Sequence, residues 1–568
     1  MKANPLSSSK LYLFLTEFLV GVCLMGVEIA SNRLFTPYVS GSQVVLTIVT
    51  VVVMVGMALG NFFGGRLSEK KGAQTRLYVL LSIAGVYVIF DAFLGRYLIA
   101  GVSALFALFV DAGLIVWITL TASLLILFPP MLILGMVTPN LVKFAVRDSG
   151  FSGKIVGLVE SMNTVGSILG TLLPTFVTIP FIGTPLSFAL FGIILILLGL
   201  IYILTGVFTS LKKKEPVEGK KEPEESPVSK KAIVAKLVLS SLCLFAAIGG
   251  TILDARSSFV FWGDGTIIYE GESQYNYLQV KEKYDTYYFS TNVMFSVQSL
   301  HKKDGSLTGM YYDDCLMASY MAKEAKKDDG PVSVLVLGNA TGTYASLLKD
   351  KRHFPFATEI DGVEIDQAII DLGYRYFDCP KDMNVYCDDG RAWLHKAKKK
   401  YDVIMVDAYS SISAPFQMTT VEFFEEVKSH LNPMGVVAMN INMVSEGRDS
   451  VNAALCDTAS SLFGDVAAYR VYGGSNLEVF ATVEDGLLER MERSLPLVQE
   501  VALYYRLNRV AQDSYLVRDG GIRLYDSSAD VEVRSMLTID GLIFAELEGF
   551  RKAFQEGGLP GLLEYLFN

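Results

Sequence analysis

The stretch "VSVLVLGNATGTYASLL" (residues 332–348) decides the fold of the second half of this chain. Its first six residues are mostly apolar, Gly338 and Gly342 frame a short turn, and helix-forming residues follow. A buried strand, a glycine turn and a helix start are typical of nucleotide-binding sheets, because glycine lets a ligand approach the backbone and the helix amides. The turn alone is common in unrelated sheets, so the neighbouring sequence has to support it.

The same alternation of apolar strand and amphipathic helix continues downstream. Further strands are predicted at "DGVEID", "YDVIMVDAY" and "GVVAMNINM". Continuous apolar strands joined by helices indicate a doubly wound parallel sheet that is covered on both faces. In such sheets ligands bind at the carboxyl ends of the strands, near the point where the strand order reverses.

Acidic residues stand at these strand ends. Glu364 ends the second strand, Asp389 follows the third in "YCDDGRAWL", and Asp407 ends the fourth. An acid about 20 residues beyond the glycine turn typically accepts hydrogen bonds from ribose hydroxyls. Asp389 is suitably placed for the exocyclic amine of an adenine. Glycines and acids in this order predict a nucleoside pocket.

The first half of the chain is too apolar for a water-soluble protein: the whole chain is 51% hydrophobic, with a mean hydropathy of +0.38. A helix needs about 20 apolar residues to cross a bilayer. The sequence predicts a six-span domain (1–209), a charged linker (210–231) and a seventh span, then a β subdomain (252–330), the sheet domain (331–540) and a helical tail (541–568). The seven predicted spans are 11–31, 43–64, 77–95, 113–137, 155–180, 185–207 and 232–251, with a separate interfacial helix at 97–110.

Charge in the connections predicts the topology. The loops 65–76, 143–154 and 212–231 are rich in Lys and Arg, which indicates that they lie on the cytoplasmic side. The N-terminus is then expected in the cytoplasm as well. Seven crossings would put the soluble domain outside the cytoplasm. The net charge of −10 argues against a nucleic-acid partner, so we expect the bilayer and a small-molecule or membrane-linked substrate as partners, with a homodimer left open.

Two predicted spans carry acids, Glu28 and Glu160. Intramembrane carboxylates are costly and face a protein interior or an aqueous cavity. Hydrogen bonding between helices explains them as well as a substrate path does. The second option gives one alternative function, a transporter with a ligand-sensing soluble domain.

From about 265 to 535 the chain resembles spermidine synthases (aminopropyltransferases), and specifically the membrane proteins with such a domain fused behind a multi-span region. The motifs that carry the resemblance are "YEGESQYNYLQVKEK", "YYDDCLMAS", "VLVLGNATG", "VEID", "CDDGRAWL", "YDVIMVDAYSS" and "LYDSSADVEV". The resemblance implies a β-hairpin subdomain before a methyltransferase-like, Rossmann-like sheet. It also implies S-adenosylmethionine or its decarboxylated form as donor, held by Gly338, Gly342, Glu364 and Asp389.

The sequence departs from that family at the positions of its catalytic and substrate-binding residues. Ala340 or Thr341 stands where the family has the Asp that holds the donor's ammonium group, and Ser410 stands at the position of the base. Asn276 replaces a Gln, and the family's Tyr-His-Glu aligns with Asp313, Asp314 and Cys315. These departures predict a transferase, aminopropyl- or methyl-like, that is not a true spermidine synthase.

The candidate residues of this pocket fall into two groups. Candidate catalytic residues are Asp407, Asp314, Asp313, Tyr409 and Tyr275. Candidate substrate-binding residues are Asn276, Gln274 and Ser410. The same carboxylates suit an alternative, a cofactor-independent acid/base enzyme acting on an extracytoplasmic sugar or lipid-linked substrate.

Metal and disulfide chemistry have weaker signals. His301, His353, His395 and His430 are scattered without paired-ligand spacing, so no metal site is expected. The soluble half has four cysteines, which are reduced thiols in a cytoplasmic domain and candidates for disulfides in an exported one. They are Cys315, Cys379, Cys387 and Cys456.

Overall fold

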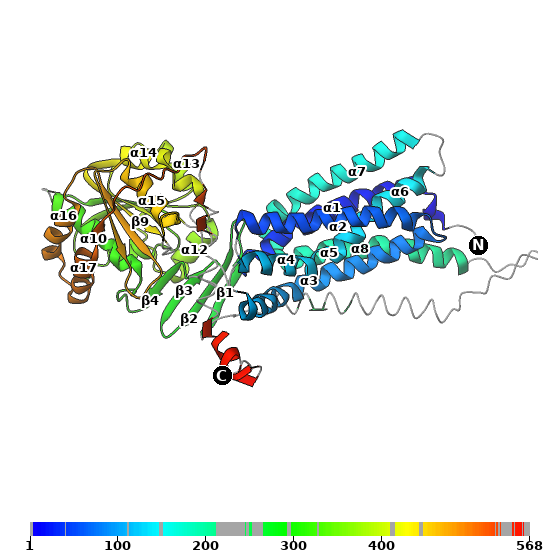
Figure 1. Ribbon diagram of the computed structural model, residues 1–568, viewed down its shortest axis with the longest axis horizontal. Helices are drawn as coiled ribbons and strands as arrows, with labels where there is room; N and C mark the ends of the chain where they lie inside the picture. The colour runs from blue at the N-terminus through cyan, green and yellow to red at the C-terminus, as the bar shows by residue number, and fades with distance from the viewer. Residues whose placement is uncertain are drawn as a thin grey trace, which may run out of the picture. The chain divides into compact units, whose positions relative to one another are not determined.

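The computed structural model divides the chain into a helical unit, which ends at Phe259, and an α/β unit, which begins at Val260 (Figure 1). Nearly all of the predicted linker and of the seventh span and most of the tail lie outside the described residues, as do Tyr409 and Ser410. The structure describes residues 4–39, 41–110, 113–146, 152–211, 245, 249–250, 252, 265–291, 297–326, 329–408, 415–441, 447–528, 530–531, 534–535, 548–549, 551–558 and 560–561.

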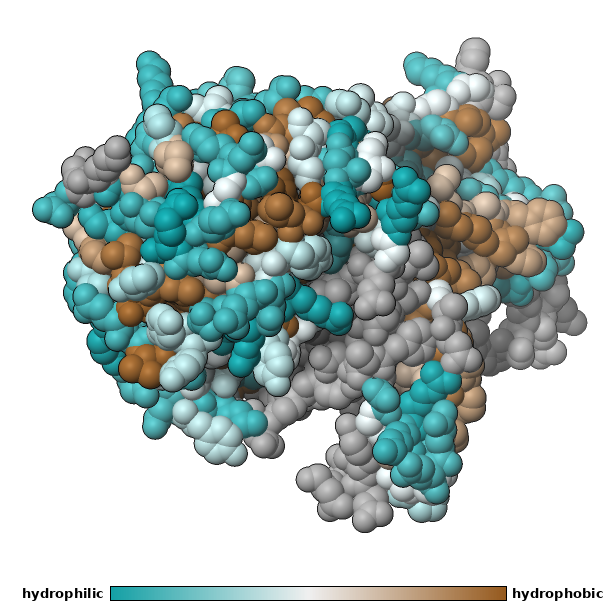
Figure 2. All heavy atoms as spheres, turned by 60° about the vertical axis from the view of Figure 1, so that its left-hand side comes forward, coloured by the Kyte–Doolittle hydropathy of each residue, from teal (hydrophilic) through white to brown (hydrophobic). Residues whose placement is uncertain are grey.

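The helical unit is built from long apolar helices with an apolar outer surface. Figure 2 shows hydrophobic side chains on the visible surface of this unit and mostly hydrophilic ones on the α/β unit. Among the described residues, five segments are long and apolar enough to cross a membrane, which is compatible with a multi-pass membrane protein. The helices are α1 (Lys10–Phe35), α2 (Gln43–Ser68), α3 (Ala73–Phe109), α4 (Leu114–Ile126), α5 (Phe128–Gly135), α6 (Val137–Val146), α7 (Ser152–Leu173) and α8 (Ile179–Leu211), with a π-helical turn at Pro174–Thr178.

Two predictions for this unit are wrong. Residues 97–110 form no separate interfacial helix, because α3 runs unbroken through them to Phe109. The predicted span 113–137 is not one helix. It breaks at Leu127, where Pro129 and Pro130 bring no backbone N–H to continue the helix, and again at Met136.

A third helix break, at Gly183, agrees with the predicted boundary between two spans. The apolar segment Gly153–Thr209 has 57 residues, about 85 Å of helix, which is far more than the roughly 30 Å of a hydrocarbon core. Gly183, with φ 79°, interrupts helical geometry inside α8. The segment is therefore long enough for two crossings, with a break between the predicted spans 155–180 and 185–207.

Glycines let the helices of this unit pack backbone against backbone. A Cβ atom at Gly166 or Gly170 of α7 would lie 2.1 Å from the Phe18 carbonyl oxygen or 2.3 Å from that of Val22, both on α1. A Cβ atom at Gly60 of α2 would lie 2.3 Å from a backbone oxygen of α5. Such small-residue contacts are typical of membrane helices.

The α/β unit contains a small antiparallel sheet, ordered β1-β2-β3-β4, and an eight-stranded sheet, ordered β12-β10-β11-β9-β8-β5-β6-β7. The strands are β1 (Thr266–Glu272), β2 (Tyr277–Lys283), β3 (Thr286–Ser290), β4 (Ser299–Lys302), β5 (Val332–Leu337), β6 (Thr358–Glu364), β7 (Asn384–Cys387), β8 (Tyr401–Val406), β9 (Leu431–Ile441), β10 (Asp465–Arg470), β11 (Leu477–Thr482) and β12 (Tyr515–Leu516). The helices are α10 (Tyr311–Ala325), α11 (Thr343–Lys349), α12 (Gln367–Tyr376), α13 (Gly390–Lys396), α14 (Val421–Ser429), α15 (Val451–Ser460), α16 (Leu487–Ser494) and α17 (Val501–Asp513).

Helices cover both faces of the large sheet (Figure 1), which confirms the predicted fold class. In β5, Val334 and Val336 pack with α10, α11, α16 and α17, while Leu335 and Leu337 pack with α13, α14 and α15. Side chains of a strand alternate between faces, so an uninterrupted apolar run buries both. Strands β5 to β9 are parallel, and the order reverses between β5 and β8.

The close α1–α7 contact can be tested with two alanine substitutions in α7. Gly170→Ala should lower stability by about 1–3 kcal/mol, since its methyl group would meet backbone that cannot rotate away. Gly157→Ala is the matched control, because nothing lies within 4 Å of its Cβ position, and it should be neutral or stabilising by up to about 1 kcal/mol. Thermal unfolding in detergent measures both variants. Equal midpoints would contradict the packing.

Candidate functional site

The glycine turn lies at the reversal of strand order. Gly338 (φ 85°) follows β5, and Gly342 (φ 87°) precedes α11. A Cβ atom on Gly338 would lie 2.5 Å from the carbonyl oxygen of Asp407, so the turn rests directly on the chain leaving β8. Only glycine combines this backbone geometry with that approach.

Glu364, at the end of β6, faces the turn. Its carboxylate accepts hydrogen bonds from the backbone N–H groups of Ala340, at 2.9 Å, and Asp366, at 3.1 Å. The side chain is buried, and burial raises the pKa of Glu364 to about 7, against the opposing effect of these backbone donors. A buried acid with this pKa changes charge near neutral pH.

The β1–β2 hairpin turn reaches the same place. The Ser273 hydroxyl and the Asn276 amide both donate to the carboxylate of Asp366, the amide at 3.1 Å. Asp366 also donates its backbone N–H to Glu364, so Asn276 lies one hydrogen-bonded residue away from Glu364. Gln274 and Tyr275, from the same turn, are exposed.

Asp389 lies at the neighbouring strand end and caps a helix. One carboxylate oxygen accepts a hydrogen bond from the Ala392 N–H at 2.8 Å, at the start of α13. The adjacent Gly390 lies beside Leu337, with 3.8 Å between its Cβ position and that of Leu337. Asp389 thus stands at the carboxyl edge that carries the glycine turn.

Asp407 is held by two donors that the sequence did not indicate. The Tyr311 hydroxyl donates to one oxygen at 2.6 Å, and the Asn440 amide donates to the other at 2.8 Å. Burial raises the pKa of Asp407 to about 7 despite both hydrogen bonds. A small cavity opens beside it, lined by Val406, Ala408, Met418, Thr419, Met439, Asn440 and Leu455.

Asp313 and Asp314 are occupied elsewhere. Asp313 accepts hydrogen bonds from the Thr308 N–H and hydroxyl and from the Gly309 N–H. Asp314 accepts two from the Arg506 guanidinium, at 2.6 and 2.8 Å, and burial raises its pKa to about 6. Both side chains are fully buried, so they fix the start of α10 against its loop and α17.

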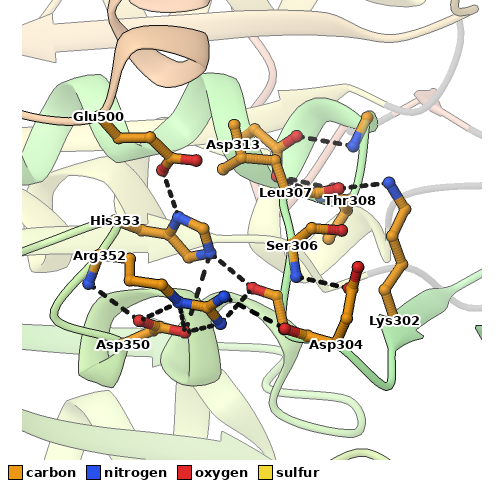
Figure 3. Close-up of polar contacts among 12 residues, drawn as sticks. Lys302, Asp304, Ser306, Leu307, Thr308, Asp313, Asp350, Arg352, His353 and Glu500 are labelled. Carbon is orange, nitrogen blue, oxygen red and sulfur yellow. Dashed lines mark hydrogen bonds and ion pairs between the residues drawn. The ribbon is translucent and has the colours of Figure 1, made fainter.

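The loop between β4 and α10 is fixed from several sides (Figure 3). The buried His353 ring contacts the Gly305 carbonyl through Nε2, at 2.8 Å, and Glu500 through Nδ1, at 2.5 Å. The Arg352 guanidinium donates to the carbonyl of Gly305 as well, and Lys302 donates to that of Leu307. These contacts determine where α10 begins, and therefore where Tyr311 points.

A second buried acid lies in the sheet next to this group. The Cys315 thiol donates to Glu478 at 2.8 Å, and burial raises the pKa of Glu478 well above its usual range. Glu478 lies opposite Asn440 in the β9–β11 pairing. The sequence analysis did not single out Glu478, because it lies within an otherwise ordinary apolar strand. The four cysteines of the α/β unit that had been candidates for disulfides are all unpaired thiols.

The described part of the chain contains no group of three His, Cys, Asp or Glu side chains that could hold a metal ion. The residues that the structure does bring together are the glycine turn, Glu364, Asp389, Asp407 and Asn276. Asp313 and Asp314 are not part of this group, because Asp313 is bonded to Thr308 and Gly309, and Asp314 is paired with Arg506. Tyr311 and Asn440 are additions to the site, whereas Arg506 belongs to the contacts that hold Asp313 and Asp314 away from it.

Comparisons with known proteins point to one family. The spermine/spermidine synthase domain matches residues 315–472. A probable polyamine aminopropyl transferase of Bifidobacterium longum is 40% identical over 349 residues, covering 58% of this chain and 76% of that protein. Polyamine aminopropyltransferase 2 of Pseudomonas aeruginosa is 27% identical, covering 36% and 57%. A crystal structure of a probable spermidine synthase from Corynebacterium glutamicum aligns with a TM-score of 0.35 at 17% identity, covering 47% and 97%.

Removing the His353 ring should loosen the loop that positions Tyr311. In His353→Ala the Gly305 carbonyl keeps its hydrogen bond from Arg352 and loses the one from the ring, which costs about 0.5–1.5 kcal/mol. Hydrogen–deuterium exchange of amides 305–309 should then become about two- to tenfold faster. His395→Ala is the control, because that side chain is 78% exposed. Unchanged exchange in His353→Ala would show that the ring does not hold the loop.

Proposed function

Because the chain belongs to the spermine/spermidine synthase family, we propose that its α/β unit transfers an aminopropyl group from decarboxylated S-adenosylmethionine to an amine beside Asp407. The helical unit would make this a membrane-anchored transferase. The observation that carries the proposal is the convergence of the glycine turn, Glu364 and Asp407 at the reversal of strand order, where doubly wound sheets bind ligands.

The residues present fit a nucleoside. Ionised Glu364 offers acceptors for two ribose hydroxyls, and the glycine turn leaves backbone open to the rest of the donor. Asn339 Oδ1 and Thr341 Oγ1, both in the turn, are buried without a hydrogen-bond partner among the described residues. Buried polar atoms are normally paired, so these two support a polar ligand at this place.

Asp407 is the group that we assign to the acceptor amine. A sulfonium donor supplies a carbon whose bond to sulfur breaks as the amine nitrogen attacks, leaving a neutral thioether. The amine must lose a proton, and a carboxylate with a pKa of about 7 can accept it near neutral pH. Tyr311 and Asn440 hold that carboxylate in one orientation.

The cofactor-independent alternative is less well supported by this geometry. It requires several carboxylates free to act on a substrate. Asp313 is saturated by backbone and hydroxyl donors, and Asp314 is paired with Arg506. The two carboxylates that remain, Glu364 and Asp407, are those a nucleoside-dependent transferase would use.

Nucleoside binding should depend on the charge of Glu364. The ionised form accepts ribose hydroxyls, and its pKa is raised to about 7, so affinity should fall as pH drops below 7. Calorimetry with methylthioadenosine should show tighter binding at pH 8 than at pH 6. Glu364→Gln should weaken binding about 10- to 100-fold and abolish the pH dependence.

Glu359→Gln is the control for that titration, since Glu359 lies at the opposite end of β6 with its side chain 62% exposed. It should bind like the wild type. Binding by Glu364→Gln that is unchanged in strength would place the nucleoside elsewhere. Titrations with S-adenosylmethionine and its decarboxylated form then identify the donor.

Turnover should depend on Asp407. With decarboxylated S-adenosylmethionine and an amine, release of methylthioadenosine should rise with pH up to about 7 and then level off, because the base must be deprotonated. Asp407→Asn should lower kcat about 100-fold or more while nucleoside affinity stays close to that of the wild type. The exposed Asp371→Asn is the control. Full turnover by Asp407→Asn would reject the assigned role.

A further inference from the structure

Glu17 is a fully buried carboxyl group inside the helical unit. It belongs to α1, and one of its oxygens, Oε1, accepts two hydrogen bonds. The Thr138 hydroxyl of α6 donates at 2.6 Å, and the Asn163 amide of α7 donates at 2.7 Å. The other oxygen, Oε2, is buried and has no hydrogen-bond partner among the described residues.

Among the residues that the structure describes, no cation is paired with this carboxyl group. Within the described helices, Glu17 makes no ion pair with Lys, Arg or His. On the preceding residue of α1, the Thr16 hydroxyl lies 3.1 Å from the hydroxyl of the buried Tyr78. The Tyr78 ring in turn stacks on Tyr202, with 4.2 Å between ring centroids. Glu17 therefore lies between hydroxyl, amide and aromatic groups.

The backbone around Glu17 cannot open easily. A Cβ atom at Gly21 would lie 2.4 Å from the Asn163 carbonyl oxygen, so α1 and α7 touch directly one turn beyond the carboxyl group. Thr138 is the second residue of α6, immediately after the helix break at Met136. The two donors to Oε1 are thus held by backbone packing.

An unpaired carboxylate is expensive in such an interior, and a proton removes the charge. The free Oε2 is the atom that a proton would occupy, because Oε1 already accepts two hydrogen bonds. Glu28 and Glu160, the acids noticed in the sequence, differ: Glu28 accepts a hydrogen bond from Thr50 at 3.2 Å, and Glu160 is exposed. Glu160 is nevertheless close enough for its charge to repel a charge on Glu17, which also favours the protonated form of Glu17.

We propose that Glu17, with Thr138 and Asn163, forms a proton-binding site inside the helical unit. The carboxyl group takes up a proton on Oε2 and releases it, while the two donors keep Oε1 in place. The helical unit then has chemistry of its own in addition to holding the chain in a bilayer. This inference is independent of the transferase reaction proposed for the α/β unit.

Dicyclohexylcarbodiimide, which reacts with protonated carboxyl groups in apolar surroundings, tests the site in the full chain reconstituted in lipid vesicles. Peptide mass mapping should find the adduct on Glu17. Its yield should fall about tenfold per pH unit above the midpoint of the titration. Glu160 is exposed on α7, where a lipid-soluble reagent can reach it as well, so its adduct is mapped and scored separately from that of Glu17.

Infrared difference spectra between acidic and alkaline pH give a second readout that needs no reagent access. One protonated-carboxyl C=O band should be present in the wild type and in Glu160→Gln and missing from Glu17→Gln, while the bands of Glu364, Asp407 and Glu478 stay in all three. Thr138→Val, which removes one donor to Oε1, should shift that band. An unmodified Glu17 at every pH, together with identical spectra for wild type and Glu17→Gln, would overturn the proposal.

Discussion

The contact between the glycine turn and the two strand ends beside it is the constraint on which the site depends. Gly338 touches the backbone at Asp407, and Ala340 donates its N–H to Glu364. These contacts bring two acids from strands on either side of β5 to one loop. A side chain at Gly338 would push the loop off β8 and separate the two acids. The pocket therefore follows from a backbone approach that only glycine permits.

The buried acids of the α/β unit fall into two groups, according to the hydrogen-bond donors and cations that surround each carboxylate. Asp313 and Asp314 are saturated by donors or paired with a cation, and they act as fixed points for α10. Glu364 and Asp407 each accept hydrogen bonds from two neutral donors and have no cationic partner among these contacts, and their pKa values rise to about 7. An acid that titrates near neutral pH can exchange a proton with a substrate, whereas one that is saturated by donors or paired with a cation stabilises structure. The acids thus take two roles, depending on the kind and number of groups that hold each carboxylate.

Much of the α/β fold could be predicted from sequence, because strand and helix periodicities and strand-end acids are local signals. The fold class was predicted in this way, and the family was predicted from a resemblance of motifs. Tyr311 could not be, since its bond to Asp407 joins residues 96 positions apart, and no local pattern fixes how α10 crosses the sheet. Asp313 and Asp314 were expected in the pocket because the family resemblance aligned them with its Tyr-His-Glu motif, and the sequence does not show that Arg506 reaches them. In the helical unit, hydropathy located the apolar segments and the break near Gly183 but missed the breaks at Leu127 and Met136, and Glu17 attracted no notice near the start of its span.

The most direct test of this account is an experimental structure of the full chain with methylthioadenosine bound. The ribose hydroxyls should lie within hydrogen-bond distance of the Glu364 carboxylate, with the nucleoside against the turn from Gly338 to Gly342 and the thioether sulfur directed toward Asp407. A nucleoside bound away from that turn, or a turn filled by the chain's own side chains, would contradict the account.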